Sequence, residues 1–171
     1  TQAAPSGRFR IAAFPTALRQ LVIPAIAQAR TAYPGLDLIP TELEPEGAFD
    51  LLGIGRLDAV LSKSLGRIPA VTPSEDTLTR IRLGVDPIDA VVPRGHRLAS
   101  RSSITLVELS SDRLAITPRE DPYTAWIASH SPDLVDFVRN AYEAVELQSL
   151  VRYVEVGLAV TVLPRMGRPH L

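Results

Sequence analysis

"GRFRIAAFPTALRQLVIPAIAQARTAYPGLDL" (residues 7–38) changes its hydrophobic period midway, and this change decides the fold. Arg8 to Phe14 ends in an unbroken apolar run, which predicts a strand covered on both faces, as in parallel sheets. The following residues repeat apolar side chains at helical spacing and predict one wide stripe, formed by Leu18, Leu21, Val22, Ala25, Ile26 and Ala29. Tyr33-Pro34-Gly35 is expected to end this helix. The stretch therefore predicts a strand, a turn and a helix.

Two residues add detail to this expected helix. Thr16 follows the Phe14-Pro15 step, and its hydroxyl can accept from free N–H groups of the first turn, so we expect it to cap the helix. Pro24 lies inside the helix and lacks the N–H that would bond to Gln20. We therefore expect a kink near Gln20.

The next segments continue the alternation of strand and helix. Leu36 to Leu43 predicts a strand at a sheet edge, because Pro40 cannot donate to a ladder. Glu44-Pro45-Glu46 opens a helix that Gly53 and Gly55 end, since proline and acids suit a first turn. Asp58 to Ser62 predicts the next strand. The order βαβαβ predicts a parallel sheet with right-handed crossovers.

The second half of the chain is a series of shorter elements. After a connection at Lys63–Thr77, we expect extended runs at Leu78–Val85 and Ile88–Pro93, a turn at Pro93–His96, a helical turn at Leu106–Leu109, a strand at Leu114–Thr117, helices at Tyr123–Ser129 and Glu146–Glu155, and a last strand at Leu158–Leu163. Leu134 to Tyr142 is expected to be extended or mixed.

Composition excludes several classes of function. The 171 residues are 46% hydrophobic and 22% charged, with a net charge of −1, which is typical of a globular domain without a strong field for nucleic acid. The chain has no cysteine, no metal-binding spacing of its three histidines and no Gly-x-Ser-x-Gly elbow. Gly53-Ile-Gly55 stands after a helix, the reverse of a dinucleotide motif. We therefore expect no metal, no cofactor and no membrane span, and a cytoplasmic protein.

The carboxyl ends of the expected strands are the candidate binding site, because ligands of open α/β sheets bind there. They carry hydroxyls, cations and helix starts but no nucleophile–base pair, which favours binding over catalysis. The candidates are Phe14, Pro15, Thr16, Pro45, Ser62, Lys63, Thr117, Pro118 and Arg119. For Lys63 and Arg119 the alternative of solvated surface charges stays open.

Four ordered segments resemble the effector-binding domain of LysR-type transcriptional regulators. They are the opening stretch at 7–38, "LLGIGRLDAVLS" at 51–62, "AVVPRGHRLASRSSITLVEL" at 90–109 and "LVRYVEVGLAVTVLP" at 150–164. Arg97 departs from the family's usual proline, and Ala159 from its second glycine. The resemblance implies an α/β fold of two Rossmann-like lobes of the periplasmic-binding-protein type (type 2).

The same resemblance implies the domain organisation. Residues 1–7 would be a linker stub, residues 8–84 lobe I, rejoined by 158–171, and residues 85–157 lobe II. Two crossovers, near Leu83-Gly84 and Leu158-Ala159, would join the lobes.

The resemblance also implies a non-enzymatic sensor in a bacterial regulator. A small effector, expected to be an organic anion, would bind between the lobes and control an N-terminal winged helix-turn-helix that is not part of this sequence. The chain would form a homodimer, with a tetramer in the full-length protein, and would meet DNA only through that missing domain. The alternatives are an extracytoplasmic solute-binding protein of an uptake system and, third, an enzyme, which would need a nucleophile–base pair.

Overall fold

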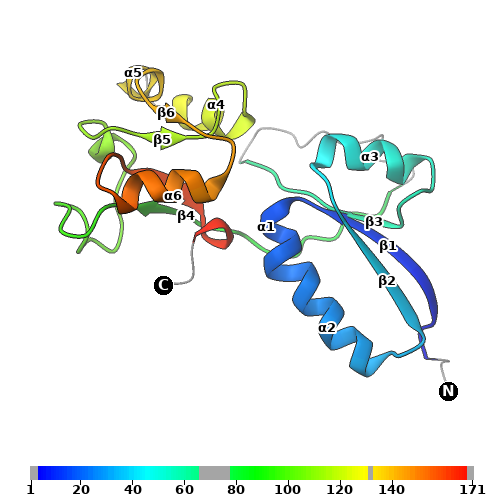
Figure 1. The fold of residues 1–171 in the computed structure, drawn as a ribbon. Helices are drawn as coiled ribbons and strands as arrows, with labels where there is room; N and C mark the ends of the chain where they lie inside the picture. The colour runs from blue at the N-terminus through cyan, green and yellow to red at the C-terminus, as the bar shows by residue number, and fades with distance from the viewer. Residues whose placement is uncertain (1–3, 66–77, 131–132, 169–171) are drawn as a thin grey trace. The chain divides into compact units, whose positions relative to one another are not determined.

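The computed structural model describes residues 4–65, 78–130 and 133–168. The chain divides into two compact units, Thr1–Leu83 and Gly84–Leu171 (Figure 1). The lobe boundaries expected from the sequence stay a prediction.

Unit 1 is a three-stranded parallel sheet with helices between its strands. Its elements are β1 (Gly7–Ala13), α1 (Pro15–Ala17), η1 (Leu18–Val22), α2 (Ile23–Ala32), β2 (Leu36–Glu42), α3 (Pro45–Gly53) and β3 (Ala59–Leu61). The strand order is β2-β1-β3, with Gly7 opposite Leu36 and Ile11 opposite Ala59. The predicted βαβαβ order is confirmed, and Pro40 lies in the edge strand β2.

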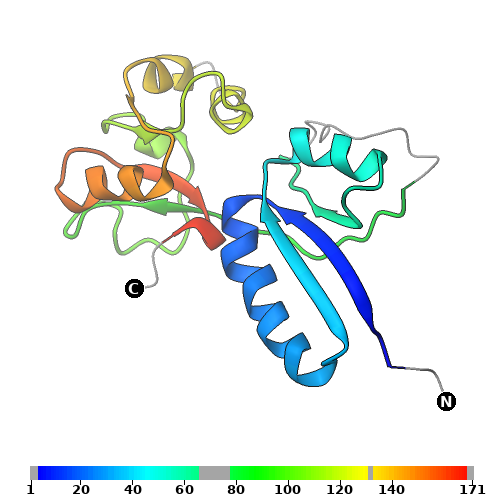
Figure 2. The same cartoon turned by 45° about the vertical axis from the view of Figure 1, so that its right-hand side comes forward.

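The two faces of the sheet are covered by different helices, as Figure 2 shows for α2 and α3. Ala12 is fully buried in a cluster with Ala48 of α3 and Leu57. Its neighbour Ala13, also fully buried, points to the other face because side chains alternate along a strand. Only the carboxyl end of β1 is therefore covered on both faces, and its first three residues are exposed.

The first helix departs from α-helical geometry where a kink is expected. Leu18–Val22 is a π-helical turn, in which the Ile23 N–H donates to the Leu18 carbonyl five residues earlier. Pro24 follows directly and has no N–H to continue the regular ladder, which accounts for the place of this turn. The predicted apolar stripe is covered only in part, because Val22 is buried whereas Leu21 is 42% exposed.

The predicted capping role of Thr16 is wrong. The residue that precedes the helix is Phe14, Pro15 is the first helical residue, and Thr16 lies buried inside the first turn without capping it. The reason is the preference of proline for the first helical position, which starts the helix one residue earlier than a Thr16 cap would.

Unit 2 is built from shorter strands. Its elements are β4 (Ile88–Val91), η3 (Val107–Leu109), β5 (Ala115–Ile116), α4 (Pro122–Ala128), α5 (Asp133–Arg139), β6 (Tyr142–Glu143), α6 (Leu147–Glu155), β7 (Thr161–Pro164) and η4 (Arg165–Gly167). β4 pairs antiparallel with β7, and β5 pairs parallel with β6. A parallel bridge between Leu114 and Val160 links the two pairs.

One element of unit 2 differs in type from its prediction. Asp133–Arg139 is the helix α5, not an extended or mixed segment. Leu134, Phe137 and Val138 are its buried residues, and their spacing of three and four places them on one helical face. This helical spacing is hard to recognise in the sequence, because the segment is short and contains the β-branched Val135 and Val138, which favour strands. Leu78 to Val85, expected to be extended, has no strand pairing in the described range 78–87.

The last strand belongs to unit 2. Leu163 of β7 pairs with Asp89 of β4, and the Asp89 carboxylate accepts from Arg165 at 2.9 and 2.8 Å and from Arg168 at 3.0 Å. Residues 161–168 therefore pack on β4, and the second crossover expected near Leu158-Ala159 is not tested by these contacts. A return of the chain to lobe I stays a prediction.

Candidate ligand-binding site

The carboxyl ends of the strands in unit 1 bring two of the predicted residues, Phe14 and Lys63, together. Lys63, two residues after β3, has its Nζ 4.9 Å from the centre of the Phe14 ring and 3.3 Å from Glu44 Oε2. Phe14 precedes α1, and Glu44 precedes α3 and its first residue, Pro45. The Lys63 ammonium is therefore the group that the residues at the strand ends, Phe14 and Glu44, surround.

Burial divides the candidates of this edge into two groups. Phe14, Thr16 and Pro45 are buried, and Ser62 and Lys63 are exposed. The Thr16 hydroxyl makes no hydrogen bond to any residue of the described ranges. Neither α1 nor α3 has a side-chain cap, so first-turn N–H groups are not satisfied by side chains there. The polar groups of this edge are thus first-turn N–H donors, the Lys63 ammonium and the Glu44 carboxylate that pairs with it.

Thr117 and Arg119 of unit 2 are engaged within their own unit. The buried Thr124 hydroxyl donates to the Thr117 carbonyl at 2.8 Å and lies 3.0 Å from the Thr117 hydroxyl. Thr124 has one hydroxyl proton, which it donates to the Thr117 carbonyl. The bond between the two hydroxyls therefore requires that the Thr117 hydroxyl donates and the Thr124 hydroxyl accepts. The Arg119 guanidinium donates to Glu143 at 2.8 Å and to the Arg139 carbonyl at 2.7 Å. Arg119 therefore fastens the loop after β5 to the end of α5 and to β6.

Helix α4 holds the same loop from the other side. The Asp121 carboxylate caps it by accepting from the Tyr123 N–H at 2.8 Å. The Tyr123 hydroxyl donates to the Val162 carbonyl of β7 at 2.9 Å, and burial, with smaller contributions from Asp121 and Asp86, raises the pKa of that hydroxyl above its usual range. These bonds link the loop that contains Thr117 and Pro118 to α4 and β7.

Sequence reasoning missed Glu44 and Thr124, the partners of Lys63 and Thr117. Each contact joins residues from different parts of the fold. The sequence did indicate that Glu44 lies at a strand end, because it stands between β2 and the proline that starts α3. It gave no indication for Thr124, because a separation of seven residues across a loop does not predict a hydrogen bond between two hydroxyls.

The proline-glycine-histidine turn, residues 93–96, is structural. Gly95 has a φ of +82°, which glycine adopts without strain. His96 Nδ1 accepts from the Leu98 N–H at 3.2 Å, so its Nε2 carries the proton and donates to Asp112 at 3.1 Å. Arg97 donates to the same carboxylate at 2.7 Å. Asp112 therefore binds both His96 and Arg97, and the turn predicted at Pro93–His96 is present.

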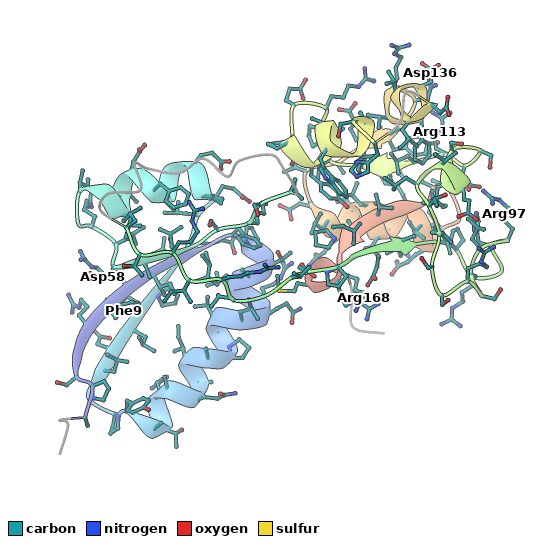
Figure 3. The ribbon with its side chains drawn as sticks, turned by 180° about the vertical axis from the view of Figure 1, so that it is seen from behind. Phe9, Asp58, Arg97, Arg113, Asp136 and Arg168 are labelled. Carbon is teal, nitrogen blue, oxygen red and sulfur yellow. The ribbon has the colours of Figure 1, made fainter. Side chains whose placement is uncertain are left out.

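A separate pocket of unit 2 lies between the loop 110–114 and α5, with a volume of about 380 Å³. Arg113 and Asp136, labelled in Figure 3, both line it. Asp136 pairs with Arg139, and Arg113 donates to the Asn140 carbonyl and lies over the Tyr142 ring. This pocket contains none of the predicted site residues.

Two other kinds of site are absent from the described residues. No group of three or more His, Cys, Asp or Glu side chains there could hold a metal ion. None of the helices described in 4–65, 78–130 and 133–168 is long and apolar enough to span a membrane.

Comparison with solved structures assigns the fold. HinK, a LysR family transcriptional regulator from Pseudomonas aeruginosa, matches with a TM-score of 0.77 at 23% identity over 97% of this chain and 55% of its own. The BenM effector binding domain with its effector benzoate matches with a TM-score of 0.73 at 19% identity over 96% and 72%. The reduced form of OxyR matches with a TM-score of 0.70 at 20% identity, over 97% of this chain and 74% of its own. The chain thus spans about half of HinK.

These likenesses show the two-lobe α/β fold of the periplasmic-binding-protein type. A search of curated proteins found no match. The family profile described as the LysR substrate binding domain matches residues 2–171, essentially the whole sequence. The chain therefore belongs to the LysR substrate-binding domain family, the regulatory domain of LysR-type transcription factors.

Proposed function

We propose that this chain is the ligand-sensing part of a cytoplasmic LysR-type regulator and that its effector is a small organic anion. The observation that supports an anionic effector is the exposed Lys63 ammonium. It lies at the carboxyl edge of the unit 1 sheet, near the starts of α1 and α3, which have no side-chain cap. BenM, a relative in fold, is seen with its effector benzoate, a carboxylate.

The residues proposed to bind the effector are the ones expected from the sequence. Those of unit 1 are Phe14, Pro15, Thr16, Pro45, Ser62 and Lys63, and those of unit 2 are Thr117, Pro118 and Arg119. Lys63 would meet the anion, the Thr16 hydroxyl would donate to it, and Phe14 would offer an apolar wall. Since Arg119 is bonded to Glu143 and Arg139, its proposed part is to hold Thr117 and Pro118 in place.

The proposed mechanism is a shift of populations. A ligand that binds one arrangement of the lobes better than another favours that arrangement by its difference in binding free energy. In a homodimer this change would alter the spacing of the DNA-binding domains, which lie outside this sequence. The energy of one helix start is only about 0.3–1 kcal/mol, so affinity must come from several groups together with apolar burial.

A thermal-shift screen tests the proposal. The panel contains benzoate, other aromatic and aliphatic carboxylates and amino-acid derivatives, with benzamide as the neutral match for benzoate. A carboxylate at 100 times its Kd should stabilise the fold by about 2.7 kcal/mol. Lys63→Met should abolish that gain, whereas Arg56→Met, which removes an exposed cation elsewhere in unit 1, should keep it. Equal stabilisation by neutral analogues, or an unchanged gain in Lys63→Met, would contradict the proposal.

A further inference from the structure

Among the described residues, the ion-pair partner of Lys63 is a carboxylate of the chain itself, that of Glu44. Lys63 is the sole lysine of the sequence. Its ammonium lies 3.3 Å from Glu44 Oε2 and 4.9 Å from the centre of the Phe14 ring. Phe14 is 8% exposed, so the ring is a fixed wall, while the two charged side chains are free to move in solvent. Glu44 therefore stands where a ligand anion on Lys63 would be expected.

The position of Glu44 does not serve its own helix. It occupies the cap position of α3, with an extended backbone at φ −69° and ψ 151°, yet its carboxylate makes no capping bond. A carboxylate there could accept first-turn N–H groups and so stabilise the helix. Instead it reaches across to Lys63, two residues after β3 and 19 positions away in the chain. The geometry thus places the carboxylate on Lys63 and leaves the helix start open.

The pair is weak enough to exchange. The Lys63 and Glu44 side chains are 52% and 55% exposed, and an ion pair of that exposure is worth about 0.2–1 kcal/mol. An incoming anion with several partners can displace such a carboxylate. If the carboxylate stays, it repels the anion at close range.

We propose that Glu44 is an internal counter-ion of Lys63 that competes with the anionic effector and thereby sets its affinity. The inference rests on the proposed function, because it concerns the same strand edge. It predicts that an anion binds more tightly when Glu44 is neutral. The change should equal the strength of the surface pair, which corresponds to a Kd lower by a factor of about 1.4 to 5.

The single lysine gives a direct test. Reductive methylation with ¹³C-formaldehyde labels Lys63 and the terminal amine, keeps both charges and yields two distinguishable NMR signals. Wild type, Glu44→Gln and Asp50→Asn are titrated with benzoate and with inorganic sulfate. Asp50 is exposed on α3, so its variant is the matched control that removes the same charge from the same helix. The terminal amine reports non-specific anion effects.

The expected result has two parts. Glu44→Gln should shift the Lys63 signal before any anion is added. It should also lower the Kd of the anion that moves this signal by a factor of about 1.4 to 5. Asp50→Asn should match wild type in both. An anion that moves the Lys63 signal with the same Kd in wild type and Glu44→Gln overturns the competition alone. Absence of any anion effect at Lys63 in all three proteins overturns the anion site as well.

Discussion

Arg10 and Asp58 form a bidentate ion pair that joins β1 to the turn before β3. The Asp58 carboxylate accepts from Arg10 Nε at 3.0 Å, from its Nη2 at 2.8 Å and from its backbone N–H at 2.7 Å. The Asp58 N–H in return donates to the Arg10 carbonyl at 2.8 Å. Asp58, labelled in Figure 3, is thus the residue that sets β3 beside β1.

The first prediction concerns the acid stability that this pair confers. The bonds from Arg10 lower the pKa of Asp58 to about 2, below the value near 3.9 of an unfolded chain. Because the pKa is lower in the folded state, the ionised Asp58 stabilises the fold fully at a pH above the unfolded-state pKa. This stabilisation is lost as the pH falls through the folded-state pKa of about 2. Asp58→Asn should therefore unfold at lower denaturant than wild type at pH 7, with a difference that shrinks between about pH 4 and pH 2.

Denaturant titrations across that pH range check this, with Asp37→Asn as the control. The Arg8–Asp37 pair is single and its side chains are 68% and 60% exposed, so its loss should change stability little. A constant gap between wild type and Asp58→Asn from pH 7 to pH 2 would contradict the assignment.

The second prediction compares two buried threonines of unit 2. Thr124 is 1% exposed and fully hydrogen-bonded to Thr117, whereas the Thr161 hydroxyl, at 0% residue exposure, is buried without a partner in the described residues. Thr124→Val should destabilise by about 1–3 kcal/mol, because it leaves the Thr117 hydroxyl unpaired. Thr161→Val should stabilise by about 1 kcal/mol, since it removes an unsatisfied polar atom at nearly constant volume. Thermal and denaturant unfolding measure both, and equal signs for the two variants would refute the argument.

The third prediction concerns self-association through the exposed apolar side chains of unit 1. They include Ile23, which is 52% exposed, together with Leu21, Tyr33, Phe9 and Ile39. We expect a homodimer in which the Ile23 side chain is covered. Ile23→Asp should shift the protein to monomer without lowering the stability of the monomer, while Gln28→Asp, at an exposed polar site of α2, should leave the dimer intact. Analytical ultracentrifugation decides, and a wild-type monomer at high micromolar concentration would rule out the dimer.

The fourth prediction is that this chain alone lacks specific DNA binding. Its net charge is −1, and Arg165 and Arg168 are both paired with Asp89, which leaves less charge for phosphates. Fluorescence anisotropy with promoter DNA at about 150 mM salt should show no binding at nanomolar protein, the range of specific complexes. Sequence-specific binding in that range would place DNA recognition in this part of the protein.

Local pattern determined much of the fold. The change from strand to helical period at Phe14, and Pro40 as the mark of an edge strand, predict the βαβαβ order that unit 1 adopts. Pro24 marked the place of the π-helical turn. These signals work because each depends on one residue and its near neighbours. Where the local signal was mixed, as in α5, the type of element was mispredicted, since only burial of Leu134, Phe137 and Val138 selects the helix.

Tertiary structure alone decided the partners of the charged and hydroxyl groups. The sequence by itself predicted that strand ends would carry the site, because parallel strands bring their carboxyl ends to one edge. It did not determine that Lys63 would meet Glu44 and Phe14, or that Arg119 would be used by Glu143 and Arg139. An ion pair forms between whichever charges the register of distant strands brings within about 4 Å, and that register is a property of the packed sheet rather than of any local segment.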